Sequence, residues 1–206
     1  MLHYETIDPT TLELLKNLLQ IPEFSDLRLA GGTSLALQIG HRKSIDLDLF
    51  GKLDADSFAV SSRLSRLGES ILLKQTQNIH IYLINGIKVD LVNYPYPWIE
   101  EINDRDQLRL AGKSDIAAIK LAAITGRGTR KDFIDLYFLL REFDLGTMLR
   151  FYSEKFYDGS PFLVLKSLAY FEDAEQEPDP FMIGKIEWQS VKETISFAVM
   201  EYLKNL

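Results

Sequence analysis

Hydrophobic residues recur at helical spacing in some parts of the chain and alternate with polar residues in others. Leucines at positions 12, 15, 18 and 19 follow Asp8-Pro9, which predicts a helix over residues 9–20 with a proline in its first turn. A second helix is expected over residues 33–39, ended by Gly40. A third is expected after a cap at Asp54 or Asp56 and reaches about residue 68.

Strands are predicted between these helices. Short strands are expected at residues 27–30 and 45–50, the latter with Ile45, Leu47 and Leu49 facing the core. The strongest hairpin signal covers about residues 70–92. Within it, two alternating runs at 79–84 and 87–92 flank Asn85-Gly86, the dipeptide most typical of a two-residue hairpin turn. Prolines at 95 and 97 predict an irregular segment after this hairpin.

The second half of the sequence has helical patterns only. Helices are expected over residues 115–125, capped by Ser114, and over 130–142, 146–157, 161–171 and 189–203, with an acidic loop at 172–180. We therefore expect an α+β fold, in which residues 1–110 form an α/β core and residues 111–206 form a helical region packed on it.

Composition narrows the class of protein. Of the 206 residues, 46% are hydrophobic and 26% are charged, as in ordinary soluble globular proteins. The absence of cysteine excludes a disulfide scaffold, a thiolate metal site and a cysteine nucleophile, and three scattered histidines argue against a histidine zinc site. A net charge of −7 argues against a surface devoted to nucleic acid, although a local basic patch is compatible with it. The start of the chain lacks a signal-peptide pattern and no apolar run approaches the roughly 20 residues of a membrane span, so we expect a cytoplasmic protein with no membrane partner.

The candidate chemistry lies in a glycine pair followed by two aspartates. Asp46 and Asp48 are two residues apart on a predicted strand, so their carboxylates point to the same side and repel each other unless a cation such as Mg²⁺ lies between them. Gly31-Gly32 leads into a helix N-terminus, which suits a phosphate, and Thr33 adds a hydroxyl there. Asp90, on the returning hairpin strand, fits as a third carboxylate that binds metal or takes a proton.

Each of these features alone has a simpler interpretation. A Gly-Gly pair is usually a turn, an Asp-x-Asp strand is more often an exposed edge, and Asp90 alone is usually a solvated strand residue. Their order along the chain, a glycine turn before a helix and then strands with two and one aspartates, favours phosphoryl or nucleotidyl transfer.

The same residues carry a family resemblance. Gly31-Gly32-Thr33 followed by Asp46-Leu47-Asp48 resembles the G-[ST]-x-D-h-D signature of polymerase-β-like nucleotidyltransferases. Residues 30–50 as a whole resemble the AbiEii/AbiGii-type toxins of bacterial abortive-infection and toxin–antitoxin systems. Residues 115–120 and 127–136 are similar to second-half motifs of that branch, so the resemblance covers about residues 30–140. It implies a polymerase-β-like mixed sheet with flanking helices, followed by a helical C-terminal half.

The resemblance also implies roles for individual residues. Asp46 and Asp48 are the expected catalytic metal ligands. Nucleotide phosphates would be bound by Gly31, Gly32 and Thr33, and Ser44 lies close enough in sequence to contact a phosphate.

In the helical half, the resemblance implies two further catalytic residues. Lys120 would neutralise the triphosphate, and Asp135 would orient Lys120 or the acceptor. The alternative for this pair is an ordinary ion pair between helices, which does not exclude a catalytic role. Asp132 and Asp135 are three apart, hence neighbours on one face of their helix.

Basic and aromatic residues near these motifs allow two interpretations each. Two basic clusters flank the proposed site: Arg42-Lys43, and residues 126–131, which include Arg127. They would contact the triphosphate or a nucleic-acid acceptor, or alternatively they are loop charges exposed to solvent. Tyr94, Tyr96 and Trp98 would stack on a base, although packing is the commoner role.

The function implied is a Mg²⁺-dependent nucleotidyltransferase toxin that adds nucleotides from an NTP to an RNA such as tRNA and has a cognate antitoxin. One alternative is a transferase of the same fold that modifies a hydroxyl of a small molecule or a protein. The other is a catalytically silent binding module. The sequence leaves the oligomeric state open.

Overall fold

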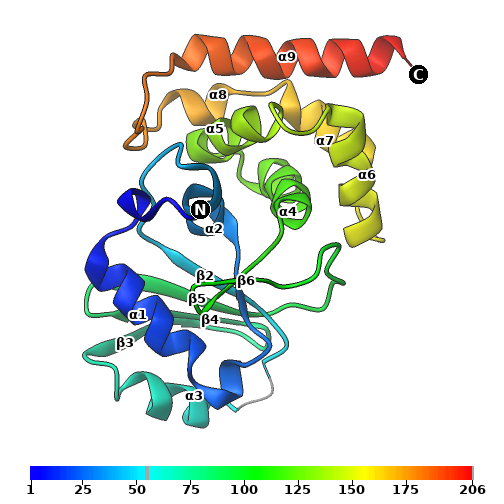
Figure 1. Ribbon diagram of the computed structural model, residues 1–206. Helices are drawn as coiled ribbons and strands as arrows, with labels where there is room; N and C mark the ends of the chain where they lie inside the picture. The colour runs from blue at the N-terminus through cyan, green and yellow to red at the C-terminus, as the bar shows by residue number, and fades with distance from the viewer. Residues whose placement is uncertain (54–55, 206) are drawn as a thin grey trace. The chain divides into compact units, whose positions relative to one another are not determined.

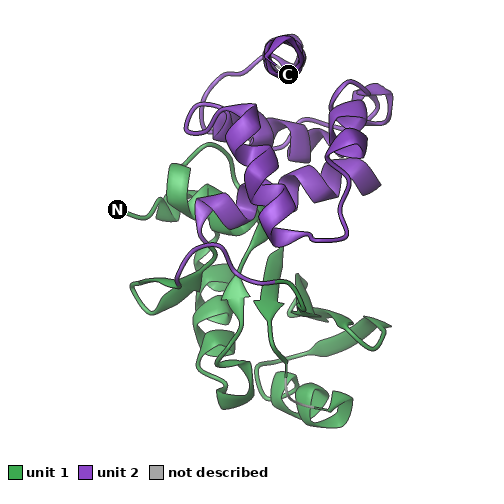
Figure 2. Cartoon of the chain, turned by 90° about the vertical axis from the view of Figure 1, so that its right-hand side faces the viewer, with its two compact units in different colours: residues 1–96, 102–111 green, residues 97–101, 112–206 purple. Residues whose placement is uncertain are grey.

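The structure, a computed structural model, describes residues 1–53 and 56–205. These residues form two compact units (Figure 2). The first unit comprises residues 1–96 and 102–111, and the second comprises 97–101 and 112–206. The expected domain boundary after residue 110 stays a prediction, because compactness does not show that either part folds alone.

The first unit is built on one mixed seven-stranded sheet in the order β3-β4-β5-β2-β1-β7-β6 (Figure 1). Its strands are β1 (Arg28–Leu29), β2 (Leu47–Gly51), β3 (Ser70–Gln75), β4 (Ile79–Ile84), β5 (Ile87–Asn93), β6 (Asn103–Arg105) and β7 (Leu108–Leu110). Strand β2 pairs parallel to β5, and β1 pairs parallel to β7, while the other neighbours are antiparallel.

Helices α1 (Pro9–Leu19), α2 (Gly31–Ile39) and α3 (Ser57–Leu64) complete the first unit, with 3₁₀ turns at Tyr4–Thr6 and Pro22–Phe24. The helix predicted over 9–20 is confirmed as α1. Its buried leucines join those of β2, β5 and α3 in one core cluster, which covers one face of the sheet. Burial along β2 alternates, so Leu47 and Leu49 are fully buried, whereas Asp48 and Phe50 face the other side.

The predicted hairpin over residues 79–92 is confirmed by β4 and β5. Its turn residues Asn85 and Gly86 have φ values of +49° and +81°, the left-handed conformation that this two-residue turn requires. The hairpin of β6 and β7 was not predicted. Its turn consists of Asp106 and Gln107, which adopt φ values of +53° and +67° without a glycine to mark the turn.

Three boundaries differ from the sequence prediction. Helix α2 begins at Gly31 instead of Thr33, so the two glycines belong to its first turn. Strand β2 begins at Leu47, and Ile45 is 64% exposed and does not face the core, because it lies in the loop before the strand. Helix α3 ends at Leu64 instead of near residue 68, while its predicted cap at Asp56 is confirmed: Asp56 accepts a hydrogen bond from Ala59 N (2.8 Å), and Asp54 lies outside the described residues.

The second unit is helical. Its helices are α4 (Lys113–Gly126), α5 (Arg130–Leu139), α6 (Leu145–Lys155), α7 (Pro161–Leu168), α8 (Glu172–Glu175) and α9 (Trp188–Lys204). Helix α4 packs against α5, α6 and α7, and α9 contacts those same three helices (Figure 1). Gly112, instead of Ser114, occupies the N-cap of α4, and the short helix α8 forms within the predicted acidic loop. The predicted fold class, a mixed sheet with flanking helices followed by a helical half, is confirmed.

A fully buried ion pair holds residues 97–101 to the helices of the second unit. Lys155 Nζ lies 2.7 Å from Asp115 Oδ1 and donates to the Pro97 carbonyl at 2.7 Å. The Asp115 carboxylate also accepts hydrogen bonds from the backbone N–H groups of Ile99 (2.9 Å) and Glu100 (3.0 Å). Both side chains are completely buried, and these contacts satisfy the charges that burial would otherwise penalise.

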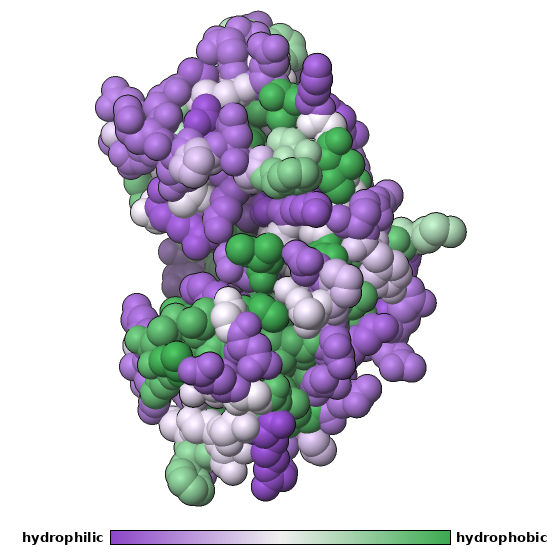
Figure 3. Space-filling view, turned by 90° about the vertical axis from the view of Figure 1, so that its left-hand side faces the viewer, coloured by the Kyte–Doolittle hydropathy of each residue, from purple (hydrophilic) through white to green (hydrophobic). Residues whose placement is uncertain are grey.

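Within residues 1–53 and 56–205, no helix is long and apolar enough to cross a membrane. On the face of the molecule shown in Figure 3, hydrophilic side chains cover much of the surface and hydrophobic ones form separate patches.

Replacing Lys155 by methionine is expected to destabilise the protein by about 3–5 kcal/mol, because the Asp115 carboxylate would remain buried without its cation. The free energy of unfolding in urea measures this loss. Lys166→Met, at an exposed position of α7, is the matched control and should change stability by no more than about 0.5 kcal/mol. An equal, small effect of both substitutions would contradict the assignment of Lys155 to a buried pair.

Candidate active site

The first turn of α2 lies directly against the Asp48 carboxylate. Ala30 N donates to the Asp48 carbonyl (2.8 Å), which joins the end of β1 to β2 immediately before the helix. Gly31 has a φ of +61°, and a Cβ placed on it would lie 2.3 Å from Asp48 Oδ2. Only glycine readily adopts this φ and leaves room for the carboxylate. Glycine at position 31 therefore allows the Asp48 carboxylate to lie against the helix N-terminus.

The Thr33 hydroxyl fixes the loop that carries Asp46. Its Oγ1 is hydrogen-bonded to Ser44 Oγ at 2.8 Å and to the Asp46 carbonyl. Ser44 N in turn donates to the Thr6 carbonyl (2.9 Å). The predicted site residues Thr33, Ser44 and Asp46 are therefore brought together, with Thr33 buried and acting through the backbone of Asp46.

Asp90 is the register partner of Asp48 on the neighbouring parallel strand β5. Residues in register on adjacent strands point to the same face and lie about 4.8 Å apart in the hydrogen-bonding direction. Lys88, two residues earlier on β5, places Nζ at 2.6 and 2.7 Å from the two oxygens of Asp90. Lys88 is not among the site residues predicted from the sequence, although its i, i+2 spacing already puts it on the same face of the strand as Asp90.

This arrangement fits a Mg²⁺ site that uses few protein ligands. Among the residues that the structure describes, no group of three or more His, Cys, Asp or Glu side chains is placed to hold a metal ion. Mg²⁺ is commonly bound by one or two carboxylates together with substrate phosphates; Asp48 places one carboxylate against a helix N-terminus, and Asp46 lies two residues earlier in the loop that Thr33 holds. The prediction that Asp90 is a third ligand stays a prediction, and it would require the carboxylate to leave Lys88.

Lys120, from α4, forms a buried ionic cluster with two aspartates of α5 inside the second unit. Lys120 Nζ lies 2.9 Å from Asp132 Oδ1 and 2.6 Å from Asp135 Oδ2, and both carboxylates are fully buried. Arg127 and the Thr129 hydroxyl also contact Asp132. Lys120 and Asp135 are thus in direct contact, as both the ion-pair and the catalytic interpretation expect.

The Asp132 carboxyl is held in its ionised form. Burial alone would raise its pKa, but the charges of Lys120 and Arg127, with hydrogen bonds from Arg127 and Thr129, bring the pKa well below its usual range. Asp132 therefore keeps its negative charge at neutral pH, and Lys120 and Arg127, which contact it directly, compensate this charge.

The remaining basic and aromatic candidates lie in different environments. Arg42 is buried and donates to the Lys43 carbonyl (3.0 Å), whereas the Arg127 side chain is 61% exposed. Tyr94 packs between Phe50 and Tyr96, with ring centroids 5.1 and 5.3 Å apart. In the second unit, the Trp98 ring covers the Lys155 ammonium at 4.4 Å, so Trp98 has a packing role there.

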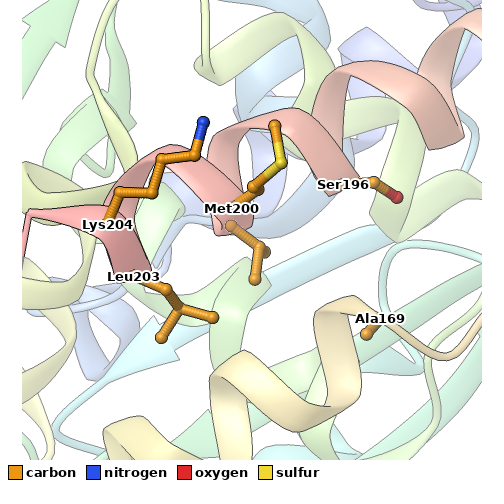
Figure 4. Close-up of a pocket in the computed structure, with 6 residues that line it drawn as sticks. Ala169, Ser196, Met200, Leu203 and Lys204 are labelled. Carbon is orange, nitrogen blue, oxygen red and sulfur yellow. The ribbon is translucent and has the colours of Figure 1, made fainter.

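The second unit also carries a mostly apolar groove of about 410 Å³ between the end of α7 and α9. Figure 4 shows its lining, which consists of Ala169, Ser196, Val199, Met200, Leu203 and Lys204. None of the predicted site residues lines this groove, so we do not assign it to the active site.

Solved structures with a similar fold include several nucleotidyltransferases. A putative nucleotidyltransferase from Helicobacter pylori aligns with a TM-score of 0.63 and 20% identity, covering 96% of this chain and 93% of that one. MenT4, a nucleotidyltransferase toxin from Mycobacterium tuberculosis H37Rv, aligns with a TM-score of 0.60 and 17% identity over 92% of this chain and 82% of its own. At these identities the similarities show that the chain shares the fold of these proteins.

Sequence comparison shows the family. The model for the nucleotidyl transferase AbiEii toxin of a type IV toxin–antitoxin system matches residues 13–205. The uncharacterized protein aq_aa25 of Aquifex aeolicus is 37% identical over 201 residues, which cover 94% of this chain and 96% of that protein. The chain belongs to the AbiEii family and is a nucleotidyltransferase, which confirms the resemblance seen in its motifs.

Replacing Gly31 by alanine is expected to destabilise the first unit by about 1–3 kcal/mol, because the new Cβ meets Asp48 and the backbone conformation is strained. Urea unfolding measures the effect. Gly126→Ala is the matched control: nothing lies within 4 Å of its Cβ position at the end of α4, so it should be neutral or stabilise by up to about 1 kcal/mol. A neutral Gly31→Ala would show that Asp48 does not lie against this turn.

Replacing Arg127 by glutamine is expected to cost about 1 kcal/mol at pH 7, since Arg127 is largely exposed and its charge is screened. A carboxyl whose folded-state pKa is lowered stabilises the protein above the unfolded pKa of about 4 and loses that contribution as the pH falls below it. Both wild type and variant should therefore lose stability below pH 4, but the difference between them should persist to pH 2.5, because Asp132 in the folded protein stays ionised until the pH reaches its strongly lowered pKa. Unfolding curves from pH 7 to pH 2.5 measure this difference, and Lys185→Gln, which changes an exposed lysine of the same unit, should not show the cost at any of these pH values.

Proposed function

We propose that this AbiEii-family toxin is a Mg²⁺-dependent enzyme that transfers a nucleotide from an NTP to an RNA acceptor, with tRNA as the expected substrate. One observation carries the metal-dependent part of the proposal. The Asp48 carboxylate lies against the N-terminal turn of α2, and Thr33 ties the loop bearing Asp46 to that same turn. A phosphate-binding helix end and two metal-binding carboxylates thereby share one corner of the first unit.

In this proposal Asp46 and Asp48 hold Mg²⁺, and the first turn of α2, from Gly31 to Thr33, binds the nucleotide phosphates through backbone N–H groups that have no intrahelical acceptor. Bound Mg²⁺ would polarise the phosphate under attack and offset its charge. Thr33 and Ser44 act by fixing the loop, because their hydroxyls are bonded to each other and Thr33 is bonded to the Asp46 carbonyl.

The reaction exchanges a phosphoanhydride bond of the NTP for a phosphoester bond to the acceptor. A hydroxyl oxygen of the acceptor forms a bond to the α-phosphorus, the bond from that phosphorus to the bridging oxygen breaks, and pyrophosphate leaves with the bond's electron pair. The hydroxyl proton is released to the medium. The carboxylates and the helix N-terminus contribute position and charge compensation, which are the main requirements of this chemistry.

The choice of a nucleic-acid acceptor is supported by exposed basic residues on an otherwise acidic chain. Lys43 is exposed in the loop before β2, and the Arg127 side chain is 61% exposed at the end of α4. Phosphate contacts of this kind position a nucleic acid without reading its sequence. The catalytic roles of Lys120 and Asp135 stay predictions of the family resemblance, and their 2.6 Å contact supports the part in which Asp135 orients Lys120.

The test is an incubation with Mg²⁺, each labelled NTP in turn, and total tRNA. Label should appear in tRNA with at least one NTP, and Asp46→Asn and Asp48→Asn should each lower the rate by about 100-fold or more, because each removes an anionic ligand of the metal ion that would compensate the negative charge of the transition state. Transfer should stop when Mg²⁺ is removed with a chelator and return when it is added back.

Asp104→Asn is the matched control, because it removes an equal charge at an exposed position of β6 in the same unit and should leave the rate unchanged. Label in a protein or small-molecule fraction instead of tRNA would contradict the acceptor. Equal activity of Asp46→Asn and Asp104→Asn would contradict the metal site, and calorimetry without Mg²⁺-dependent NTP binding would indicate a silent binding module.

A further inference from the structure

Helix α9 exposes large apolar side chains on its outer side. Its inner side contacts α5, α6 and α7 and holds the buried residues of the helix. On the outer side, Phe197, Met200 and Leu203 are 60%, 45% and 53% exposed. Figure 4 shows Met200 and Leu203 projecting from the helix. Adjoining exposed apolar side chains of this kind mark interaction surfaces, so the outer side of α9 is a candidate interface.

Two of these residues belong to a regular line of side chains that carries a charge at each end. Glu193, Phe197, Met200 and Lys204 follow one another at spacings of four, three and four residues, which places them on one face of the helix. Glu193 and Lys204 are both exposed and lie about 17 Å apart along the helix axis. We call these four residues the α9 seam.

The charged ends of the α9 seam have only local partners within the chain. Glu193 accepts a hydrogen bond from Gln189 (2.9 Å), and Lys204 contacts Glu201 at 2.7 Å. The side chains of Lys204 and Glu201 are 60% and 43% exposed. Contacts between neighbouring turns on an exposed helix surface contribute little to stability. Both ends of the seam can therefore exchange these partners for an opposite charge on another molecule.

The α9 seam is complementary to a second copy of itself. In an antiparallel pair of α9 helices, Phe197 of each copy meets Met200 of the other, and Glu193 of each meets Lys204 of the other. A twofold axis produces such an interface, in which every contact occurs twice. A parallel pair would instead bring like charges together at both ends, which is repulsive. The order of charge along the seam therefore favours a second copy of the chain in the antiparallel orientation.

The groove between the end of α7 and α9 extends this apolar surface. It shares Met200 and Lys204 with the α9 seam and continues across Leu203 to Ala169 at the end of α7. A specific interface buries about 800 Å² on each partner. Because the groove adjoins the seam, the apolar area available to a second copy is larger than one line of side chains supplies.

We propose that two copies of the chain associate through the α9 seam as an antiparallel dimer with twofold symmetry. The contacts of Phe197 with Met200 supply most of the affinity, and the pairs of Glu193 with Lys204 fix the orientation. This inference does not depend on the proposed metal site, because every residue that carries it lies in the second unit.

Sedimentation velocity of the full chain over about 1–100 μM tests the association. Wild type should form dimers that dissociate on dilution. Phe197→Glu should stay monomeric at the highest concentration, because association would bury its charge in an apolar contact. Phe58→Glu, at an 84% exposed position of α3 in the first unit, is the matched control and should associate like wild type.

Charge reversal at the exposed ends of the seam tests the identity of the partner. Glu193→Lys and Lys204→Glu should each weaken the dimer by about 10-fold or more, because each places like charges together at both ends. The two changes combined should restore the dissociation constant to within about threefold of wild type, since the charge pairs form again with opposite polarity. The two residues are too far apart within one chain for this rescue to arise there.

The orientation can be tested with single cysteines, because the chain has none of its own. A short thiol-to-thiol cross-linker should join Glu193→Cys to Lys204→Cys when the two variants are mixed. Neither variant should cross-link with itself, because equivalent positions in an antiparallel pair lie about 17 Å apart along the helix axis. A parallel pair would give the opposite result, with each variant linked to itself.

Several results would overturn the proposal. A wild type that stays monomeric at about 100 μM would show that the α9 seam does not bind a second copy and would leave it to a partner of another sequence. Association of folded Phe197→Glu equal to that of wild type would place the interface elsewhere. Failure of the combined charge reversal to restore the dimer, or cross-linking of either cysteine variant with itself, would overturn the antiparallel arrangement. The proposed metal site would stand in each case.

Discussion

The first unit is organised by the close packing of the start of helix α2 against strand β2. The hydrogen bond from Ala30 N to the Asp48 carbonyl brings the two backbones together and leaves no room for a side chain at position 31. The same approach places Thr33 where its hydroxyl reaches the Asp46 carbonyl. Asp48 and the loop that carries Asp46 are therefore held by contacts of their backbone carbonyls, so the residues that fold this corner also position both predicted site residues.

In the second unit, oppositely charged side chains form ion pairs that are buried in the interior. Lys120 and Lys155 are buried with Asp132, Asp135 and Asp115, although apolar residues of similar size would fill the space at least as stably. The pair of Lys155 and Asp115 has a clear structural purpose, because it also binds backbone groups of residues 97–101 and orders that segment. In the cluster around Lys120, the partners are side chains of two adjacent helices, which hold the ammonium group in one place between two carboxylates.

Local signals in the sequence predicted most elements of the fold. Asn85-Gly86 identified the hairpin of β4 and β5 because that turn demands left-handed residues, whereas Asp106-Gln107 adopts the same conformation without any residue that demands it. The alternation expected of a strand correctly predicted that Leu47 and Leu49 are buried in the core. The same prediction was wrong for Ile45, because the strand begins two residues later. The sequence could not show the contact of Gly31 with Asp48, since it depends on how a helix and a strand that are distant in sequence pack together.

Alternation along a strand explains the positions of Asp48 and Asp90 but not that of Asp46. Asp48 and Asp90 are register partners on the parallel strands β2 and β5, so their side chains share one face of the sheet, and Lys88, two residues before Asp90, contacts Asp90 on that face. Asp46 lies in the loop before β2, where alternation no longer applies, and its carbonyl is bonded to Thr33 in the first turn of α2. Considered one strand at a time, the sequence predicts which residues of that strand share a face, whereas the pairing of Asp48 with Asp90 follows from the register of the sheet.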